Sequence, residues 1–366
     1  ELRDKDNKNY FGKSVFKAVE NINGPIMKAL KNTESNDQSK IDKILIDLDG
    51  TEQKKKLGAN AILAVSLASC KLAAIEKKIS LFQHLGNSKS NQLPIPLLNI
   101  INGGVHAKNN LDIQEFMIRP DKTNSFSEAM RRSFLVIQNL KGIIDNTNVG
   151  DEGGFAPNLK ENEEAINLLI KSIEKSGFKP GTDISICLDV AANELFKKNK
   201  YAIHSKKFIS VSKSISEYTK LIKKYKIKSI EDPFAENDWS SWNKFMIATN
   251  NQIQIVGDDL YVTNLQRLKV GFLNRSTNSI LIKLNQIGTV TETIEVIKFA
   301  QNIGFNTIIS HRSGESEDTF IADLAVGTNS NQIKSGSLCR SERVAKYNQI
   351  LRIEESLGKN AKMNKI

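Results

Sequence analysis

Cysteine is scarce in this chain of 366 residues, and the three that occur, Cys70, Cys187 and Cys339, are far apart and form no CxxC pair. A disulfide framework or a thiolate zinc site needs closely spaced cysteines, so neither is expected. The longest apolar run, residues 59–74, is interrupted by polar side chains and falls short of the about 18 apolar residues of a membrane helix. We find no secretory signal. We predict a cytoplasmic protein with free thiols, no membrane span and a buried helix at 59–74.

Acidic residues are fewer than basic ones, 41 against 52, which gives a net charge of +11. A charge of this sign can indicate a nucleic-acid surface. Here, however, the lysines are scattered among asparagines, and the one local run, residues 54–56, has no aromatic residues between its charges. We attribute the charge to a general bias toward lysine and asparagine, and we expect no nucleic-acid partner.

The sequence pattern divides the chain into two parts. Residues 13–32 and 57–78 carry the apolar spacing of helices, and a polar stretch at 86–92 has the composition of a connection. We predict a smaller, incomplete α+β domain at 1–89 and a larger domain at 90–366. With 39% hydrophobic and 25% charged residues, the chain has the composition of a folded protein and the length for two such domains.

From residue 93 on, short apolar segments alternate with segments of helical length. The segments predicted as strands are 94–101, 111–118, 184–188, 227–230, 253–256, 279–282, 306–309 and 332–333. Two intervening helices are predicted to begin with a capping box, Ser214 with Glu217 and Thr289 with Glu292. Strands that alternate with helices predict a parallel sheet, and this many units favour a closed β/α (TIM-like) barrel. The first two strands are too close for a crossover helix, so we expect them to pair antiparallel in an irregular barrel.

Each later strand ends in a polar residue. These residues are Asp189, Glu231, Asp258, Lys283, His311 and Lys334, and from Glu231 on they are 23 to 28 residues apart. Because barrel active sites form at the C-terminal ends of the strands, we expect these side chains to meet at one mouth. A single carboxylate there is more often a cap or a turn residue, but six polar strand ends in succession favour a site.

The residue types at these strand ends indicate a metal and a base. Asp189, Glu231 and Asp258 are oxygen donors without a cysteine or histidine nearby, which favours Mg²⁺ over Zn²⁺. A lysine held near like charges and a divalent cation is expected to have a pKa lowered toward the range of a general base. Gln114 and Glu115 are adjacent in an expected strand, so one of them must point inward.

Eight motifs link this pattern to a known family. They are KLGANAILAVSLA, NIINGGVHAKNNLDIQEFMI, GDEGGFAPN, SIEDPFAENDW, GDDLYVTN, ILIKLNQIGTVTET, SHRSGESED and IKSGS. In this order, over nearly the whole chain, they resemble the enolase family. The resemblance implies a carbon–oxygen lyase that interconverts 2-phosphoglycerate and phosphoenolpyruvate in glycolysis and gluconeogenesis.

By this resemblance, Asp189, Glu231 and Asp258 are metal ligands in a site that takes two Mg²⁺ ions. Lys283 is the base that removes the C2 proton of the substrate. Glu152, in the GDEGG motif, is the general acid, which must be protonated to help hydroxide leave from C3.

The resemblance also assigns the residues around the reacting groups. They are Gln114 and Glu115 (an active-site pair), His106 (on a mobile loop), His311, Arg312 and Ser313 (phosphate contacts) and Lys334 (the substrate carboxylate). Two roles stay open at this point. His106 could be only a loop hydrogen-bond donor, and Glu115 could orient Glu152 or a water molecule rather than move a proton.

Three features depart from the family pattern. Lys108 stands where the family usually has an acid, and Asn193 stands where it usually has a serine. The family's first strands, with their small-residue SGASTG loop, have no counterpart here. From this last departure we expect a fragment in which the second Mg²⁺ site is weakened and turnover is slower by at least about a hundredfold.

Two alternative functions remain. A racemase or cycloisomerase of the same superfamily usually carries a Lys-x-Lys base motif, whereas Leu281 stands two residues before Lys283. The other is a catalytically impaired enolase-like scaffold or binding protein, because of the missing loop. The family resemblance further implies a homodimer, with an octamer as an alternative, and allows an additional cell-surface or secreted pool.

Overall fold

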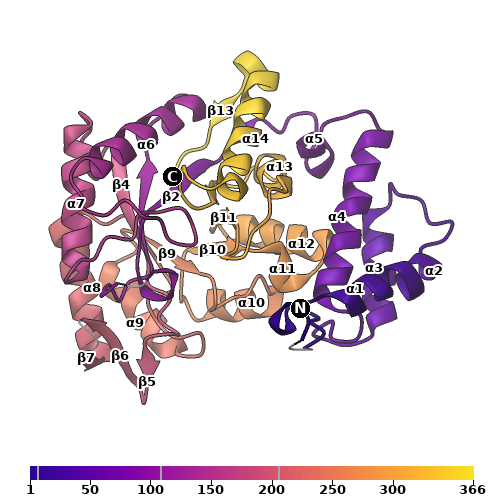
Figure 1. Ribbon diagram of the computed structural model, residues 1–366, viewed down its shortest axis with the longest axis horizontal. Helices are drawn as coiled ribbons and strands as arrows, with labels where there is room; N and C mark the ends of the chain where they lie inside the picture. The colour runs from indigo at the N-terminus through magenta and orange to yellow at the C-terminus, as the bar shows by residue number, and fades with distance from the viewer. Residues whose placement is uncertain (6–7, 108, 205–206) are drawn as a thin grey trace.

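Eight strands close into a barrel in this computed structural model, which describes residues 1–5, 8–107, 109–204 and 207–366 (Figure 1). Around the barrel they are β10 (Ser279–Ile282), β11 (Asn306–Ser310), β12 (Gln332–Lys334), β2 (Ile95–Asn102), β3 (Glu115–Pro120), β4 (Ile184–Asp189), β8 (Ser229–Glu231) and β9 (Gln254–Gly257). β3 is antiparallel to both β2 and β4, and the other neighbouring strands are parallel. The prediction of an irregular barrel with an antiparallel first pair is confirmed.

The second strand begins later than predicted, at Glu115 rather than at residue 111. The backbone N–H groups of Asp112 and Ile113 donate to the side-chain oxygen of Asn162 instead of to a neighbouring strand, at 3.1 and 3.2 Å. A contact of this kind, between residues far apart in sequence, leaves no local signal.

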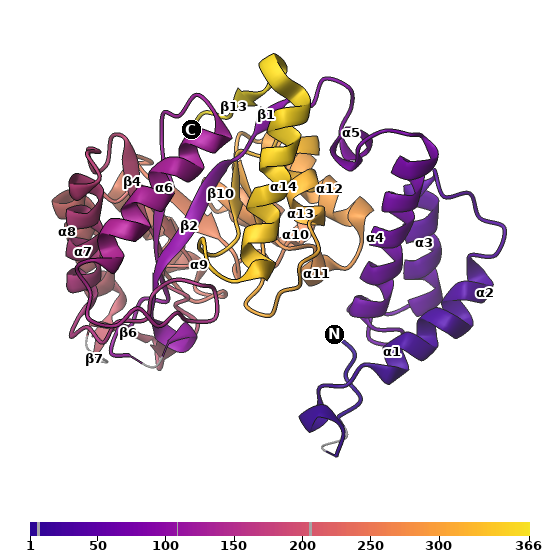
Figure 2. The same cartoon turned by 45° about the horizontal axis from the view of Figure 1, so that its top comes forward.

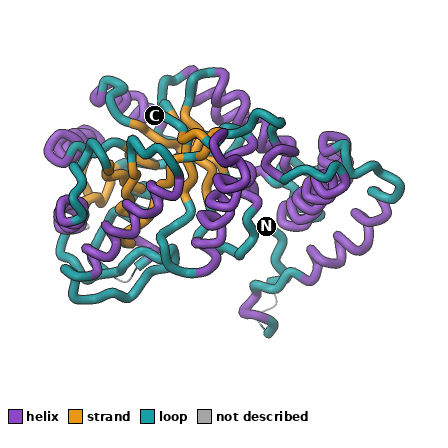
Figure 3. Tube along the Cα trace, turned by 90° about the horizontal axis from the view of Figure 1, so that it is seen from above, coloured by secondary structure: helices purple, strands orange, loops and turns teal. Residues whose placement is uncertain are grey.

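Helices cover the outside of the barrel, with the strands gathered in the middle (Figure 3). The helices are α6 (Phe126–Lys141), α7 (Asn162–Lys175), α8 (Val211–Tyr225), α9 (Trp239–Thr249), α10 (Leu265–Leu273), α11 (Leu284–Ile287), α12 (Val290–Asn302), α13 (Phe320–Gly327) and α14 (Ser341–Leu357). Two small sheets are added, one of β5 (Phe196–Lys197), β6 (Lys200–His204) and β7 (Lys207–Ser210), the other of β1 (Gln92–Leu93) and β13 (Lys362–Met363).

Apolar side chains fill the middle of the barrel. They are Leu97, Met117, Cys187, Val256, Leu281 and Ile308, none more than 1% exposed. Burial raises the pKa of the Cys187 thiol to about 12, so this cysteine is an uncharged packing residue. The filled middle separates the two ends of the barrel from each other.

The described residues that precede the barrel are helical. The elements are η1 (Tyr10–Gly12), α1 (Phe16–Asn21), η2 (Ile22–Ile26), α2 (Met27–Ala29), α3 (Gln38–Asp49), α4 (Ala59–Glu76) and α5 (Leu81–Leu85). The helix predicted at 13–32 is broken by a π-helical turn that contains Pro25, which lacks the N–H that a regular helix requires. Among the described residues before β1 there is no strand, and the incomplete α+β domain was predicted to lack its first strands.

Helix α4 has the length and mean hydropathy, 1.4, of a membrane-spanning helix, and no other helix of the described chain does. It lies beside α3 and the barrel helices (Figure 2), and it also contacts α5, α11 and α12. Its buried positions include Ala61, Ile62 and Ser66. Core helices of globular proteins pass the same test, and this packing agrees with the buried helix predicted at 59–74.

Of the two predicted capping boxes, one is found as an N-cap alone, because the Glu292 carboxylate accepts from the Thr289 hydroxyl and not from its backbone N–H, and the other is wrong. The amide of Glu292 donates to the Thr289 hydroxyl at 3.2 Å, and that hydroxyl donates to the Glu292 carboxylate at 2.6 Å. Helix α8 is instead capped by Ser210, where β7 ends, and Ser214 lies one turn inside the helix with its hydroxyl on the Ser210 carbonyl. The sequence spacing alone did not separate a cap from a serine one turn later.

The start of α12 also joins the N-terminal helices to the barrel. Asp42 on α3 accepts hydrogen bonds from the backbone N–H and the hydroxyl of Thr291, at 2.9 and 2.6 Å. Ser66 on α4 accepts one from the N–H of Val290 at 3.0 Å. The first N–H groups of a helix have no acceptor within it, so the side chains of Asp42 and Ser66 accept the hydrogen bonds of the first N–H groups of α12.

We expect Asp42→Ala to lower the free energy of unfolding by about 2 kcal/mol, because a buried carboxylate is lost and the Thr291 donors are left unsatisfied. Asp47→Ala removes an exposed carboxylate of the same helix and should change it by less than about 0.5 kcal/mol. Urea unfolding followed by circular dichroism measures both. Equal losses in the two variants would contradict the role given to Asp42.

Candidate active site

The C-terminal ends of the parallel strands surround a cavity of about 250 Å³. The predicted site residues that line it are His106, Gln114, Glu115, Glu152, Asp189, Asp258, Lys283, His311, Arg312, Ser313 and Lys334. The remaining one, Glu231, is buried at the end of β8. The sequence therefore located one site, built from strand ends far apart in the chain.

Strand register places three carboxylates side by side. Glu115 pairs with Asp189 across β3 and β4, and Asp189 pairs with Glu231 across β4 and β8. Paired residues of neighbouring strands face the same side of a sheet, here the inside of the barrel mouth. Of the adjacent residues Gln114 and Glu115, the glutamate is the fully buried one, at 1% exposure.

The ammonium group of Lys334 lies among these three carboxylates. Its Nζ is 2.8 Å from Asp189, 2.9 Å from Glu231 and 3.2 Å from Glu115. Burial alone would lower the pKa of Lys334, but the three negative charges raise it well above its ordinary value. Lys334 is therefore charged and offsets part of the buried negative charge.

Lys283 is held by Asp258 on the neighbouring strand. Its Nζ is 2.5 Å from Asp258 Oδ2, and Gln286 donates to Oδ1 of the same carboxylate at 3.0 Å. Burial has the largest effect and lowers the pKa of Lys283, but the charges of Asp258 and Glu231 and the hydrogen bond to Asp258 together raise it above its ordinary value. The expected lowering, which involves a divalent cation, stays a prediction. The expectation assumed that Asp258 would bind a divalent cation, whereas here the Asp258 carboxylate is paired with Lys283.

Asp232, next to Glu231, supports the loop that carries Asp258. Its two carboxylate oxygens accept hydrogen bonds from the backbone N–H groups of Asp258 and Asp259, at 2.9 and 2.7 Å. Burial and the charges of these two neighbours raise the pKa of Asp232 well above its ordinary value. Asp232 was not predicted as a site residue; its signal in the sequence was its place within the SIEDPF motif.

Glu152 enters the site from the connection between α6 and α7. Asn99 on β2 donates to its Oε2 at 3.0 Å, and His311 Nε2 lies 3.4 Å from its Oε1. Burial would raise the pKa of Glu152, but His311, Lys334 and His106 lower it well below its ordinary value. Burial also lowers the pKa of His311, whereas Lys334 keeps a full positive charge at neutral pH.

Glu115 shows the opposite behaviour. Burial and the charge of Glu152 raise the pKa of Glu115 well above its ordinary value. Possible ligand atoms of His106, Glu115 and Glu152 lie within 4.8 Å of one another, so the two carboxylates share one buried space. These opposite directions favour the proton on Glu115, whereas the family resemblance implies a protonated Glu152, which stays a prediction. Two acids this close cannot both ionise at their ordinary pKa.

Arg343 on α14 fixes the backbone on two sides of the cavity. Its guanidinium donates to the carbonyl oxygens of Arg312, Ser313 and Asp151, at 2.6, 2.7 and 3.0 Å, and lies 2.5 Å from His311 Nδ1. Arg343 was not predicted as a site residue, because a buried arginine on a barrel helix has no local sequence pattern. Arg312 and Ser313 themselves are exposed at the rim.

The two local departures from the family pattern have different outcomes. Asn193 donates to Asp259 Oδ2 at 2.8 Å and accepts a hydrogen bond from the Glu236 amide at 2.9 Å. It therefore ties together the loops after β4, β8 and β9. Lys108 lies outside the described residues.

The acidic lining of the cavity suits a hard divalent cation. The acidic residues that line it are Glu115, Glu152, Asp189, Glu194, Asp232, Asp258 and Asp259, against the basic residues Lys283, Arg312 and Lys334. Burial and the charge of Asp189 raise the pKa of Glu231 well above its ordinary value, as expected where positive charge is insufficient.

The structure groups the acids differently from the prediction. Asp258 has possible ligand atoms within 4.8 Å of those of Asp232 and Asp259. Asp189 and Glu231 are outside this group and are joined through Lys334. The ligand set of Asp189, Glu231 and Asp258 therefore stays a prediction.

Together, the β/α barrel and a mouth with buried acids and two lysines define a class of enzymes that carry out acid–base chemistry on small anionic molecules. Residues 1–85 match the family model described as Enolase, N-terminal domain, and residues 90–366 match Enolase, C-terminal TIM barrel domain. The chain is 68% identical over 370 aligned residues to Enolase of Pelagibacter ubique (strain HTCC1062), with 100% of this chain and 88% of that protein covered. The chain belongs to the enolase family.

Lys334→Met should lower the free energy of unfolding by about 3 kcal/mol at pH 8, because three buried carboxylates lose their shared cation. The raised pKa of Lys334 means that its contribution is fully present at pH 8 and lost only at higher pH. In the variant the orphaned carboxylates take up protons as the pH falls, so the deficit should shrink at pH 5.5.

Urea unfolding in EDTA at the two pH values measures this deficit. Lys43→Met, which removes an exposed pair with Asp47, is the matched control and should change little at either pH. A Lys334 variant as stable as the parent at pH 8 would show that the ammonium group is dispensable.

Proposed function

We propose that this chain catalyses the reversible dehydration of 2-phosphoglycerate to phosphoenolpyruvate as a carbon–oxygen lyase. The observation that carries the proposal is the placement of a base and an acid on opposite walls of one cavity. Lys283 follows β10, whereas Glu152 is bound to Asn99 on β2 and faces Glu115 on β3, the strand directly across the barrel from β10. Loss of a proton from C2 and of hydroxide from C3 needs such a pair.

The first step is transfer of the C2 proton to Nζ of Lys283. It places a second negative charge on the substrate carboxylate, which the ammonium of Lys334 is positioned to offset. Mg²⁺ held by the carboxylates would supply further positive charge and take up the charge of Asp258 that otherwise raises the pKa of Lys283.

In the second step the bond between C3 and its oxygen breaks, and the leaving hydroxide takes a proton to become water. The pair Glu115 and Glu152 supplies this proton, with Glu152 as the donor and Glu115 as the group that retains the proton between turnovers. His106, 3.8 Å from Glu152 and 4.0 Å from Glu115, lies beside both.

The substrate is oriented from the rim of the cavity. Arg312 has a forked set of donors that fits two phosphate oxygens at once, and Ser313 and His311 lie beside it. Gln114 lines the same cavity and offers an amide to the substrate. Arg343 acts on the phosphate indirectly, because it holds the Arg312 and Ser313 carbonyls.

The remaining properties follow from the family resemblance. We propose two Mg²⁺ ions per active site, with Asp189, Glu231 and Asp258 as the protein ligands, and a cytoplasmic homodimer. A domain boundary near residue 90 is supported by a separate small core that includes Ala18, Leu45 and Ile62. Turnover of 2-phosphoglycerate by this chain distinguishes the proposal from a catalytically impaired scaffold.

Lys283→Ala should abolish exchange of the C2 proton of 2-phosphoglycerate with solvent deuterium, a loss of at least about a thousandfold, because no other described base follows β10. Mg²⁺ binding measured by calorimetry should stay within about threefold of the parent, since no proposed ligand is lost. Lys298→Ala, exposed on α12, is the control. Exchange at the parental rate would remove Lys283 from the role of base.

Glu152→Gln distinguishes the step that needs an acid, loss of hydroxide from C3, from the step that needs a base, removal of the C2 proton. The amide keeps the shape of the side chain but cannot donate a carboxylic proton, so phosphoenolpyruvate formation should fall at least about a hundredfold while C2 exchange continues. Exchange is followed by NMR in deuterated buffer, and product by its ultraviolet absorbance. Equal loss of both activities would mean that Glu152 orients the site instead.

A further inference from the structure

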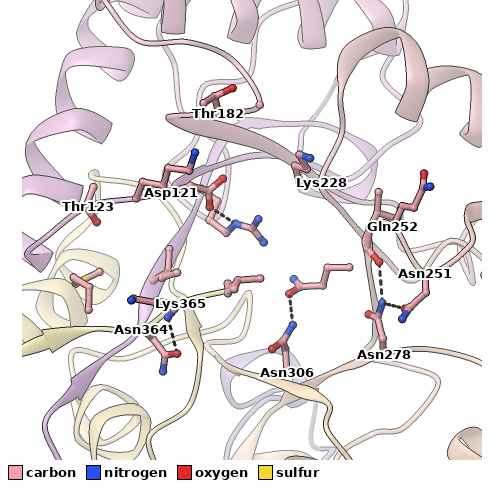
Figure 4. A pocket seen from close by; sticks show the side chains of 18 of the residues that line it. Asp121, Thr123, Thr182, Lys228, Asn251, Gln252, Asn278, Asn306, Asn364 and Lys365 are labelled. Carbon is pink, nitrogen blue, oxygen red and sulfur yellow. Dashed lines mark hydrogen bonds and ion pairs between the residues drawn. The ribbon is translucent and has the colours of Figure 1, made fainter.

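A second cavity, of about 870 Å³, lies at the opposite end of the barrel from the catalytic mouth. Lys228 and Asn278 directly precede β8 and β10, and Gln254 and Asn306 begin β9 and β11, so the cavity is at the N-terminal ends of the parallel strands. Figure 4 shows its side chains. None of the residues assigned above to the catalytic site lines it. We call this cavity the basal pocket.

Arg119 is the buried cation of the basal pocket. It is only 5% exposed, and its Nε donates to Asp121 Oδ1 at 2.8 Å. Its Nη1 has no hydrogen-bond partner. A buried guanidinium nitrogen without an acceptor is costly, so this atom is a donor prepared for an anion in the pocket.

Thr123 gives a second, independent indication. Its side chain lines the same pocket, the residue is 8% exposed, and its Oγ1 also has no partner. Two buried donors without acceptors, Arg119 within β3 and Thr123 three residues beyond its end, therefore line one cavity. Phosphate and carboxylate oxygens are the acceptors that would satisfy both.

The charges around the pocket favour an anion. Lys122, Lys228 and Lys365 line it in addition to Arg119, and Asp121 is the one acidic side chain among its described lining residues. Asp121 is already occupied, because it accepts hydrogen bonds from Arg119 and from the Ser185 hydroxyl. An anion that enters therefore meets positive charge that is only partly neutralised.

The remaining lining residues indicate which chemical groups the ligand carries besides its anionic group. Amide side chains predominate, among them Asn251, Gln252, Asn278, Asn306 and Asn364. Amides offer both donors and acceptors, which suits hydroxyl groups. No aromatic side chain is found among the described lining residues, so the pocket has no stacking surface for a nucleobase.

We propose that the basal pocket is a binding site for a sugar phosphate or another phosphorylated polyol, with the phosphate on Arg119 Nη1 and Thr123 Oγ1 and the hydroxyl groups on the amides. The site is separate from the catalytic cavity, since the apolar layer of the barrel lies between them. Both sites can therefore be filled at once. β3 connects them, because it begins with Glu115 at the mouth and carries Arg119 near the base.

Isothermal titration calorimetry with D-glucose 6-phosphate as the probe, in EDTA to keep Mg²⁺ from the catalytic acids, tests the proposal. We expect saturable binding that weakens by at least about tenfold in Arg119→Gln, which loses a charge-assisted hydrogen bond. Thr123→Val and Lys228→Gln should each weaken it by about fivefold. Inorganic phosphate alone and glucose alone should bind at least about tenfold more weakly than the probe.

Two control variants identify the site that binds the probe. Lys359→Gln removes an exposed lysine outside the pocket and should leave binding unchanged. Arg312→Gln should also leave it unchanged, whereas a loss there would place the probe in the catalytic cavity and overturn the proposal. Absence of binding, equal affinity for inorganic phosphate, or insensitivity to all three pocket variants would overturn it as well. Should Arg119→Gln fail to fold, Thr123→Val and Lys228→Gln decide the outcome.

Discussion

The ammonium group of Lys334, buried among three carboxylates, is the interaction on which the barrel mouth depends. Glu115, Asp189 and Glu231 come from adjacent strands and are nearly excluded from water, so each would be costly to ionise alone. A single cation within 3.2 Å of all three offsets part of that cost. The excess of acid that remains would suit a divalent cation.

The reversed direction of β3 is what brings Glu115 into this group. In a barrel of parallel strands only the C-terminal residues reach the mouth, as Asp189 and Lys334 do. β3 runs the other way, so its first residue, Glu115, lies in register with Asp189, the last residue of β4. The same reversal places Arg119, near the other end of β3, at the base of the barrel.

The sequence predicted most of the barrel, because strands and their polar ends are local patterns repeated at nearly constant spacing. The strand predicted at 279–282 is observed at those residues, and the six polar residues lie at or directly after their strand ends. Contacts between distant segments were not predictable in this way. Arg343 acts on loops about 30 and 190 residues away, and Asp42 caps a helix of the barrel from α3.

The protonation of the site was also not predictable from residue types. Sequence matching assigns one role to each acid, but Glu115 and Glu152 share a single buried space, and the direction of each pKa depends on the charge of the other. Hydrogen bonds and nearby charges decide which of the two carries the proton. These contacts, at distances of 3 to 4 Å, join residues on different loops and strands, and they exist only once the complete fold has formed.

Lys334 couples substrate binding to the protonation of Glu115 and Glu152 in the proposed reaction. Its charge lowers the pKa of both Glu115 and Glu152, and it is also the group that we propose meets the substrate carboxylate. A new anion beside Lys334 offsets that charge for the two acids as well, so their affinity for a proton rises when the substrate binds. The pair then holds its proton most firmly in the complex where hydroxide has to leave, and gives it up only to a stronger base, the oxygen departing from C3.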